Sequence, residues 1–267
     1  MPLFRLKFAA HSYLVMPSLS PNDMCILLYS NSEYNFLWKA TIPLLQRYAP
    51  GFKVYFCCDT TTGFTIPEHW TVFTYKTGQH WGQRVAGCVE VIQEKYILYV
   101  QEDWLLIDYV YSDIITYILE FMQSQGCEYM SSYIREIYDE PPIATQYPMY
   151  EFQRDTIHYF QPAIWSRSLL YRLTTLHRDV QTSSLMMMEN ENGKACDLTR
   201  ECICYVIQNT AFPKDISTRT IFFPHMHAIN QGKWTFLKYP TLKALVEAYG
   251  IDTSLRGIDI EWIVHLQ

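Results

Sequence analysis

The sequence predicts an α/β fold in which a mostly parallel central sheet is flanked by helices within a single domain. The first observation is the opening unit of the chain: an apolar run (Met24–Tyr29), a segment of helical spacing (33–48) and a second apolar run (Lys53–Cys58). A strand, a crossover helix and a second strand naturally give a parallel pair. The second observation is that this alternation continues until Asp139.

Each element of the first half is marked by its own signals. The run MCILLY (Met24–Tyr29) ends at three polar residues, and Pro50-Gly51 ends the helix that follows. KVYFCC (Lys53–Cys58) is closed by Asp59 and a Thr/Gly turn. The later elements are a strand at 72–75, a helix at 81–94, a strand at 96–100 (YILYV) that is apolar enough to be buried on both faces, a helix at 112–123 and a strand at 128–134.

The second half is less regular. Pro141-Pro142 and Pro148 mark an irregular loop at its start. We expect helices at 162–176, 198–209 and 240–249 and a strand-like segment at 221–223. Asp197 is a suitable N-cap for the second of these helices, and Gly250 stops the third.

Composition supports one globular domain. The 267 residues are 49% hydrophobic, and a chain of this length buries a core without disulfides or a structural metal. No repeat or linker separates independent domains. The formal net charge of −6 argues against broad electrostatic binding to nucleic acid, so we expect no nucleic-acid partner.

The cysteines and the apolar runs indicate a soluble protein of a reducing compartment. The eight cysteines form no CxxC motif and stand mostly inside apolar runs, which is typical of buried free thiols. No apolar run reaches the roughly 18 residues of a membrane span. His11 and Ser12 interrupt the apolar start that a signal peptide needs. We therefore expect a cytoplasmic location.

Polar side chains follow three of the predicted strands. They are Ser30, Asn31 and Ser32 after the first strand, Asp59 after the second, and Gln101, Glu102 and Asp103 after YILYV. Ligands of open parallel sheets bind at the carboxyl ends of the strands. Two adjacent carboxylates beside a core need a partner, and a divalent cation that bridges to a phosphate is a common one. The structural alternative is that Glu102 and Asp103 cap the following turn.

The segment 97–106 (ILYVQEDWLL), preceded by WGQR at 81–84, resembles nucleotide-sugar glycosyltransferases of the GT-A fold. Segments 160–170 (FQPAIWSRSLL) and 221–234 (IFFPHMHAINQGKW) resemble the acceptor-side and closing segments of compact members from bacteria and large DNA viruses. The resemblance implies a nucleotide-sugar-binding half at 21–135, after an N-terminal extension at 1–20. It also implies an acceptor half with a closing segment at 136–267. By the same resemblance, the location extends to the cytoplasm of a virus-infected host cell.

The resemblance also implies roles for single residues. The acidic motif of these enzymes, usually Asp-any-Asp, holds the metal. Gln101 departs from that pattern, and Asp103 is the best ligand. A histidine near the C-terminal end often completes the metal site, which points to His227 or, as the alternative, His225. Asp59 stands where an acidic residue contacts the base or ribose, and Arg84 where a basic residue reaches the nucleotide; Ser30, Asn31, Gln101 and Glu102 complete the expected nucleotide contacts.

An inverting transfer needs a carboxylate as general base on the acceptor side. We expect Glu189 in this role because it follows an apolar stretch, with Glu201 as the alternative. Trp165 is a candidate for stacking on a sugar and Lys233 for contacting a phosphate. A core tryptophan and a surface lysine are the structural readings of these two residues.

The sequence therefore predicts a glycosyltransferase that moves a sugar from a nucleoside-diphosphate donor, such as a UDP- or GDP-sugar, to the hydroxyl of a glycan or other acceptor. The expected cofactor is Mn²⁺ or Mg²⁺. One alternative is a non-catalytic nucleotide- or carbohydrate-binding protein that retains the fold. Another is a nucleotidyltransferase acting on sugar phosphates, which expects a glycine-rich basic loop that residues 30–34 do not supply.

Overall fold

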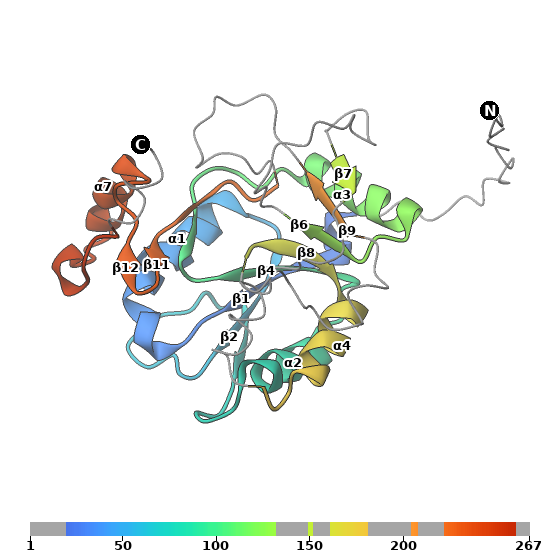
Figure 1. Cartoon of the computed structure of the whole chain (residues 1–267), viewed down its shortest axis with the longest axis horizontal. Helices are drawn as coiled ribbons and strands as arrows, with labels where there is room; N and C mark the ends of the chain where they lie inside the picture. The colour runs from blue at the N-terminus through green and yellow to red at the C-terminus, as the bar shows by residue number, and fades with distance from the viewer. Residues whose placement is uncertain (1–19, 132–148, 152–160, 181–203, 208–221, 260–267) are drawn as a thin grey trace, which may run out of the picture.

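The computed structural model describes residues 20–131, 149–151, 161–180, 204–207 and 222–259. These residues form one eight-stranded sheet and two small two-stranded sheets. Helices lie on both sides of the large sheet (Figure 1). Four of its seven strand pairings are parallel and three are antiparallel. The predicted α/β class, with a mostly parallel sheet flanked by helices, is confirmed.

The elements have the following bounds. The strands are β1 (Met24–Tyr29), β2 (Lys53–Cys58), β3 (Thr71–Thr74), β4 (Tyr96–Gln101), β5 (Trp104–Leu106), β6 (Tyr129–Ser131), β7 (Met149–Glu151), β8 (Ala163–Ser166), β9 (Cys204–Ile207), β10 (His225–His227), β11 (Ile229–Asn230) and β12 (Lys233–Trp234). The helices are η1 (Pro21–Asp23), η2 (Ser32–Leu37), α1 (Trp38–Tyr48), α2 (Trp81–Val91), α3 (Ser112–Gln125), α4 (Arg167–Leu176), α7 (Pro240–Ala248) and η4 (Thr253–Leu255).

The strand order of the large sheet reverses at β1 and β4. The order is β3-β2-β1-β4-β8-β6-β9-β7, and the first four strands are mutually parallel. From β1 the chain moves outward through β2 to β3, and then crosses back to place β4 on the opposite side of β1. This reversal is the topological switch point, where ligands of open α/β sheets bind beyond the carboxyl ends of the strands.

Both faces of the sheet are covered because side chains alternate along each strand. Leu27 of β1 packs in the cluster under α2 and α4, and its neighbour Leu28 packs in the cluster under α1 and α3. Figure 1 shows the same division, with α2 and α4 together below the sheet and α1 and α3 above it. The central strands are therefore apolar on both faces, as YILYV predicted.

A third apolar cluster attaches the C-terminal elements to α1. Trp234 of β12 and Leu242 of α7 pack with Leu37 and Leu44. This packing places β10 beside β5, with which it forms an antiparallel pair. The C-terminal part of the chain thus reaches the turn that follows β4.

Three predicted elements are corrected. The segment 162–176 is not one helix: Ala163–Ser166 is a buried strand between β4 and β6, and the helix begins at Arg167 with Ser166 as its N-cap. Within the predicted helix 198–209, Cys204–Ile207 is strand β9; the rest of that range lies outside the described residues. The predicted strand at 221–223 is displaced to His225–His227, because pairing with β5 selects that register.

Two boundaries also differ. The helix expected at 33–48 begins as the 3₁₀ helix η2 and becomes α-helical at Trp38. Helix α2 ends at Val91, where Ile92 adopts an extended conformation. Among the described helices, none combines the length and the apolar character needed to cross a bilayer.

Candidate active site

The carboxylate of Asp103 and the imidazole of His227 meet beyond the carboxyl end of β4. Nε2 of His227 lies 3.2 Å from Oδ2 of Asp103. Both side chains are partly exposed, at 22% for His227 and 15% for Asp103. Oδ1 of Asp103 is buried and finds no hydrogen-bond partner among the described residues. Both side chains of the pair are therefore partly accessible to solvent, and Oδ1 of Asp103 can accept a further interaction.

The backbone on both sides of this pair is fixed by hydrogen bonds. The amide of Ala228 donates to the carbonyl of Asp103 at 2.6 Å. The hydroxyl of Thr41 on α1 donates to the carbonyl of Glu102 at 2.7 Å, and Thr235 donates to the carbonyl of His227. The backbone at Glu102, Asp103 and His227 is consequently held by neighbouring segments of the chain.

This arrangement fits a divalent cation. Two ligand atoms about 2.1 Å from an octahedral cation, at a right angle, lie about 3 Å apart, close to the separation between His227 and Asp103. The described residues contain no group of three or more His, Cys, Asp or Glu side chains arranged to hold a metal. Two protein ligands suit Mg²⁺ or Mn²⁺, because such ions commonly retain waters and bind substrate phosphate oxygens.

The two adjacent carboxylates of the predicted motif have different environments. Asp103 faces His227, whereas Glu102 is only 6% exposed. Burial, and then the neighbouring Asp103, raise the pKa of the Glu102 carboxyl well above its usual range, although the Ser30 hydroxyl donates a hydrogen bond to it. The prediction that Glu102 contacts a nucleotide is therefore not supported, because its carboxyl is enclosed by the protein.

Ser30 is likewise an internal residue. Its side chain is buried, and its hydroxyl accepts a hydrogen bond of 2.6 Å from Nε1 of Trp38. Together with its bond to Glu102, this contact ties the end of β1 to the end of β4. The predicted contact of Ser30 with a nucleotide is thus not supported; the buried Ser30 side chain instead joins the ends of β1 and β4.

Asp59 and Asn31 lie just beyond the carboxyl ends of β2 and β1. The Asp59 carboxylate accepts two hydrogen bonds from Ser32, one from its amide at 2.8 Å and one from its hydroxyl at 2.6 Å. The Asn31 side chain caps η2 by accepting from the amide of Glu33 at 2.9 Å. Ser32 belongs to the polar run predicted after the first strand but was not among the expected nucleotide contacts.

Arg84 joins a cluster of tyrosines at the same edge. Its Nη1 donates to the Tyr29 hydroxyl at 3.1 Å, its Nε donates to the Gln79 carbonyl at 2.6 Å, and its guanidinium lies 4.6 Å from the centre of the Tyr75 ring. Tyr75 in turn donates to the carbonyl of Ser30 at 2.7 Å. Arg84 is partly exposed.

The remaining predicted residues are placed as follows. Gln101 is partly exposed at the end of β4, with its Nε2 3.5 Å from the Tyr99 hydroxyl. His225 is buried, its Nδ1 lies 2.5 Å from the Phe223 carbonyl oxygen, and burial lowers its pKa to about 3. The structure thus brings His227, and not His225, to Asp103.

The structure does not bring Trp165 and Lys233 into contact with Asp103 and His227. Trp165 is completely buried and packs edge-on against Tyr129, so its ring has no exposed face for a sugar; it is a core residue. Lys233 is exposed on β12. The expected general base, Glu189 or Glu201, lies outside the described residues.

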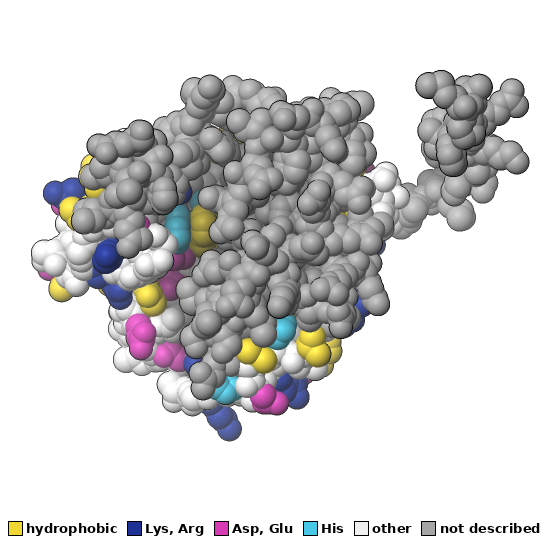
Figure 2. Space-filling view, in the orientation of Figure 1, with side chains coloured by type: hydrophobic (Ala, Val, Ile, Leu, Met, Phe, Trp, Pro, Cys, Tyr) yellow, Lys and Arg dark blue, Asp and Glu magenta, His cyan; other side chains and the backbone are white. Residues whose placement is uncertain are grey.

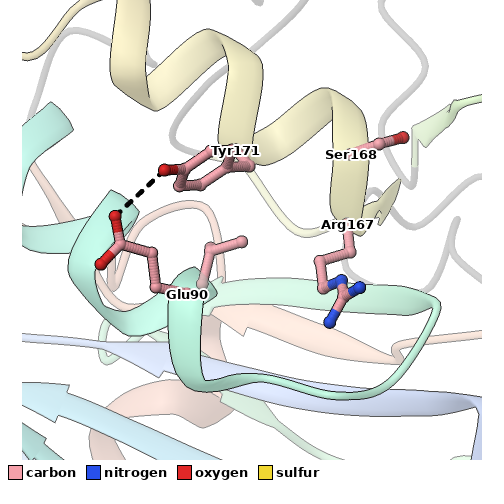
Figure 3. A pocket seen from close by; sticks show the side chains of 5 residues that line it. Glu90, Arg167, Ser168 and Tyr171 are labelled. Atoms are coloured by element: carbon pink, nitrogen blue, oxygen red, sulfur yellow. Dashed lines mark hydrogen bonds between the residues drawn. The ribbon is translucent and has the colours of Figure 1, made fainter.

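A cavity of about 350 Å³ lies elsewhere, between α2 and α4 (Figure 3). Val89, Glu90, Arg167, Ser168 and Tyr171 line it, and the Tyr171 hydroxyl donates to Glu90. Arg167 follows Ser166, which pairs with the first residue of β4. The cavity is therefore near the amino end of β4, opposite to the end that carries the acidic turn.

In the orientation of Figure 1, the space-filling view shows histidine, hydrophobic and acidic side chains next to one another beside the C-terminal elements (Figure 2). The same view shows Lys and Arg interspersed with Asp and Glu among the described residues, without a broad basic surface.

No protein-family model matches the sequence, and no curated protein matches it. Among solved structures, the chain is similar to a cytidylyltransferase from Leptospira borgpetersenii, with a TM-score of 0.43 and 14% identity over 85% of this chain and 94% of that one. It is also similar to the bifunctional IspDF from Campylobacter jejuni (TM-score 0.39, 12% identity, 75% of this chain) and to S. aureus TarS (TM-score 0.41, 10% identity, 70% of this chain). The chain spans 52% of the length of IspDF and 35% of that of TarS.

Proposed function

We propose that this protein is a glycosyltransferase that uses a divalent cation to transfer a sugar from a nucleoside-diphosphate donor to an acceptor hydroxyl. The observation that carries the proposal is the Asp103–His227 pair, with 3.2 Å between Nε2 and Oδ2. Asp103 follows β4 at the topological switch point of the sheet, and Asn31, Ser32 and Asp59 follow the neighbouring strands β1 and β2 at the same edge.

Asp103 and His227 are the residues that would hold Mn²⁺ or Mg²⁺. When bound, such a cation stabilises the negative charge that develops on a diphosphate leaving group. The protein supplies an anionic oxygen and an imidazole nitrogen whose backbones are fixed by Thr41 and Thr235. This fixation means that little reorganisation is required when the donor binds.

The donor nucleoside would lie beyond the carboxyl ends of β1 and β4. Each carboxylate oxygen of Asp59 accepts one hydrogen bond from Ser32 and has capacity for another. Asp59 can therefore accept from a ribose hydroxyl or a base N–H, and Asn31 lies beside it in sequence. Arg84 has five N–H donors; Tyr29 and Gln79 accept one each, and Tyr75 is a further hydrogen-bond partner of the guanidinium. A guanidinium donor that none of these groups uses would suit a phosphate.

The acceptor side belongs to the second part of the chain. An inverting transfer requires a carboxylate that removes the proton of the acceptor hydroxyl, and Glu189 remains our candidate, with Glu201 as the alternative. Strand β8 of this part is inserted between β4 and β6. The nucleotide half and the acceptor half therefore share one sheet, which favours a fixed geometry between donor and acceptor.

The test is release of the nucleotide from a panel of nucleotide sugars, measured with Mn²⁺, with Mg²⁺ and with EDTA: UDP, GDP or dTDP from the corresponding nucleoside-diphosphate sugars, and CMP from CMP-sugars. We expect one donor to be hydrolysed or transferred only with metal, and Asp103→Ala to abolish this activity while the circular dichroism spectrum and melting temperature remain those of a folded protein. Full activity in the folded Asp103→Ala variant would overturn the proposal. Metal-dependent nucleotide binding without any product from any sugar would instead favour a non-catalytic binding protein.

A further inference from the structure

We propose that Trp104 is a positioning residue that fixes the imidazole of His227 on Asp103. The proposal rests on the function proposed above, because it concerns the same metal-binding pair. The indole of Trp104 is stacked on the imidazole of His227, with 4.1 Å between ring centres and 9° between the ring planes. Trp104 follows Asp103 directly in the sequence and is only 7% exposed.

The stack is set by strand pairing. Trp104 on β5 and His227 on β10 are register partners in the antiparallel pair, so their side chains emerge on the same face. The indole also meets the buried His225 nearly edge-on, with ring centres 4.7 Å apart and planes at 81°. The indole is therefore packed against a buried ring and at the same time presents a flat face to His227.

A flat apolar face restricts the one motion that matters for the pair. Rotation of the imidazole about its Cβ–Cγ bond would move Nε2 away from Oδ2 of Asp103, because the torsion of a histidine ring is broad when nothing limits it. Stacking at 9° limits that rotation. Because Trp104 and Asp103 are adjacent, one segment sets both the carboxylate and the plane of its imidazole partner.

The expected consequence is a loss of metal affinity without loss of either ligand. Groups that orient metal ligands typically change affinity by about 10–100-fold when they are replaced. Trp104→Leu removes the aromatic face but keeps an apolar side chain, and Trp104→Phe retains a smaller face. Trp70→Leu is the matched control, because Trp70 is equally buried at 7% and packs on Phe56 of β2.

The experiment has two readouts on the full chain. The first, recorded without metal, is the NMR shift of the His227 ring protons, assigned by their disappearance in His227→Gln. We expect an upfield ring-current shift in the native protein that is lost in Trp104→Leu and kept in Trp104→Phe and Trp70→Leu. The second is Mn²⁺ affinity by electron paramagnetic resonance, weakened at least about tenfold in Trp104→Leu, with Trp104→Phe and Trp70→Leu close to the native protein.

The outcomes separate this inference from the proposed function. If folded Trp104→Leu keeps both the native His227 shift and the native Mn²⁺ affinity while Asp103→Asn loses Mn²⁺, the positioning role is overturned and the metal site stands. If the native protein shows the ring-current shift but binds no Mn²⁺, the positioning role stands and the proposed metal site fails. If Trp104→Leu does not fold, Trp104→Met replaces it, because an unbranched apolar side chain fills the space without an aromatic face.

Discussion

Asp103 and His227 are separated by 124 positions in the sequence, yet Oδ2 of one lies 3.2 Å from Nε2 of the other. The contact exists because β10 pairs with β5, directly after the acidic turn. It is reinforced by the hydrogen bond from the Ala228 amide to the Asp103 carbonyl. The pair is therefore completed only when the C-terminal elements pack on α1, so the metal site that we propose would depend on folding of this region.

Thr41→Val tests how the acidic turn is held. Thr41 is buried, and its hydroxyl bonds the carbonyls of Glu102 at 2.7 Å and Leu37 at 3.0 Å. Removing the hydroxyl leaves the Glu102 carbonyl without this partner, so we expect urea denaturation to show a loss of about 1–2 kcal/mol of unfolding free energy. Mn²⁺ affinity should also fall.

Thr174→Val is the control for that change, because the buried Thr174 hydroxyl bonds the carbonyl of Leu170 within its own helix α4. It should lose a similar free energy and retain native Mn²⁺ affinity. Equal Mn²⁺ affinity in Thr41→Val and Thr174→Val would show that the Thr41 contact does not position the turn.

Ser32→Ala tests the proposed nucleotide contact of Asp59 separately from the metal pair. The variant removes the 2.6 Å bond from the Ser32 hydroxyl to Asp59 and keeps the backbone bond of 2.8 Å. The Asp59 carboxylate then gains rotational freedom, so we expect nucleotide affinity to fall by roughly tenfold, equivalent to about 1.4 kcal/mol. Calorimetric titration should show unchanged Mn²⁺ affinity. Ser124→Ala, on the exposed end of α3, serves as the control. Native nucleotide affinity in Ser32→Ala would contradict the proposal that Asp59, oriented by the Ser32 hydroxyl, contacts the nucleotide.

Gly82→Ala tests the close contact of α2 and α4. A Cβ at Gly82 would lie 2.5 Å from the carbonyl oxygen of Thr174 and still closer to that of His177. Both neighbours are backbone atoms, so the helices would have to separate, and we expect a loss of about 1–3 kcal/mol or more in unfolding free energy. Gly257→Ala is the control because a Cβ there meets no atom within 4 Å. Equal stability of the two variants would contradict the packing.

From three buried tyrosines we predict how the free energy of unfolding depends on alkaline pH. Burial raises the pKa of Tyr29, Tyr75 and Tyr99 above the ordinary value, although Arg84 opposes the effect at Tyr29 and Tyr75. Below about pH 10 these phenols are protonated in both states and contribute nothing to the pH dependence. Above it the unfolded chain releases protons first, so unfolding free energy should fall as pH rises.

Denaturant titrations between pH 9 and 11, with ultraviolet detection of tyrosinate, measure this dependence. Tyr75→Phe removes one of the three phenols and should make the decline shallower. The same slope in Tyr75→Phe and the native protein would contradict the assignment of Tyr75 to this group.

The first half of the fold follows from local patterns. Strands β1, β2 and β4 are short apolar runs closed by polar residues, and the helices between them show clear amphipathic spacing, so their type and order are readable in the sequence. The second half is not readable in this way. Ala163–Ser166 runs without a break into the apolar spacing of α4, and the boundary is marked only by the cap that Ser166 provides to the Leu169 amide.

The candidate site also has a part that could be predicted from local sequence patterns and a part that could not. The positions of Asp59 and Asp103 at the carboxyl ends of β2 and β4 were predictable, because polar residues after apolar strands gather at one edge of a parallel sheet. Which of two adjacent carboxylates turns inward was not predictable, because it depends on how Thr41 and Ser30 hold the Glu102 segment. Trp104 was also missed as a positioning residue, because its role depends on its register with His227 in a pair of distant strands.

The most direct test of the central claim is a thermal-shift comparison with UDP, GDP, CMP and dTDP, each with Mn²⁺ and with EDTA, in the native protein and in Asp103→Asn. A ligand that binds the native state raises the melting temperature by mass action. We predict that one nucleotide raises it with Mn²⁺ but not with EDTA, and that Asp103→Asn loses this increase while melting cooperatively on its own. An equal increase in Mn²⁺ and EDTA, or in Asp103→Asn and the native protein, would contradict a metal-bridged nucleotide at Asp103 and His227.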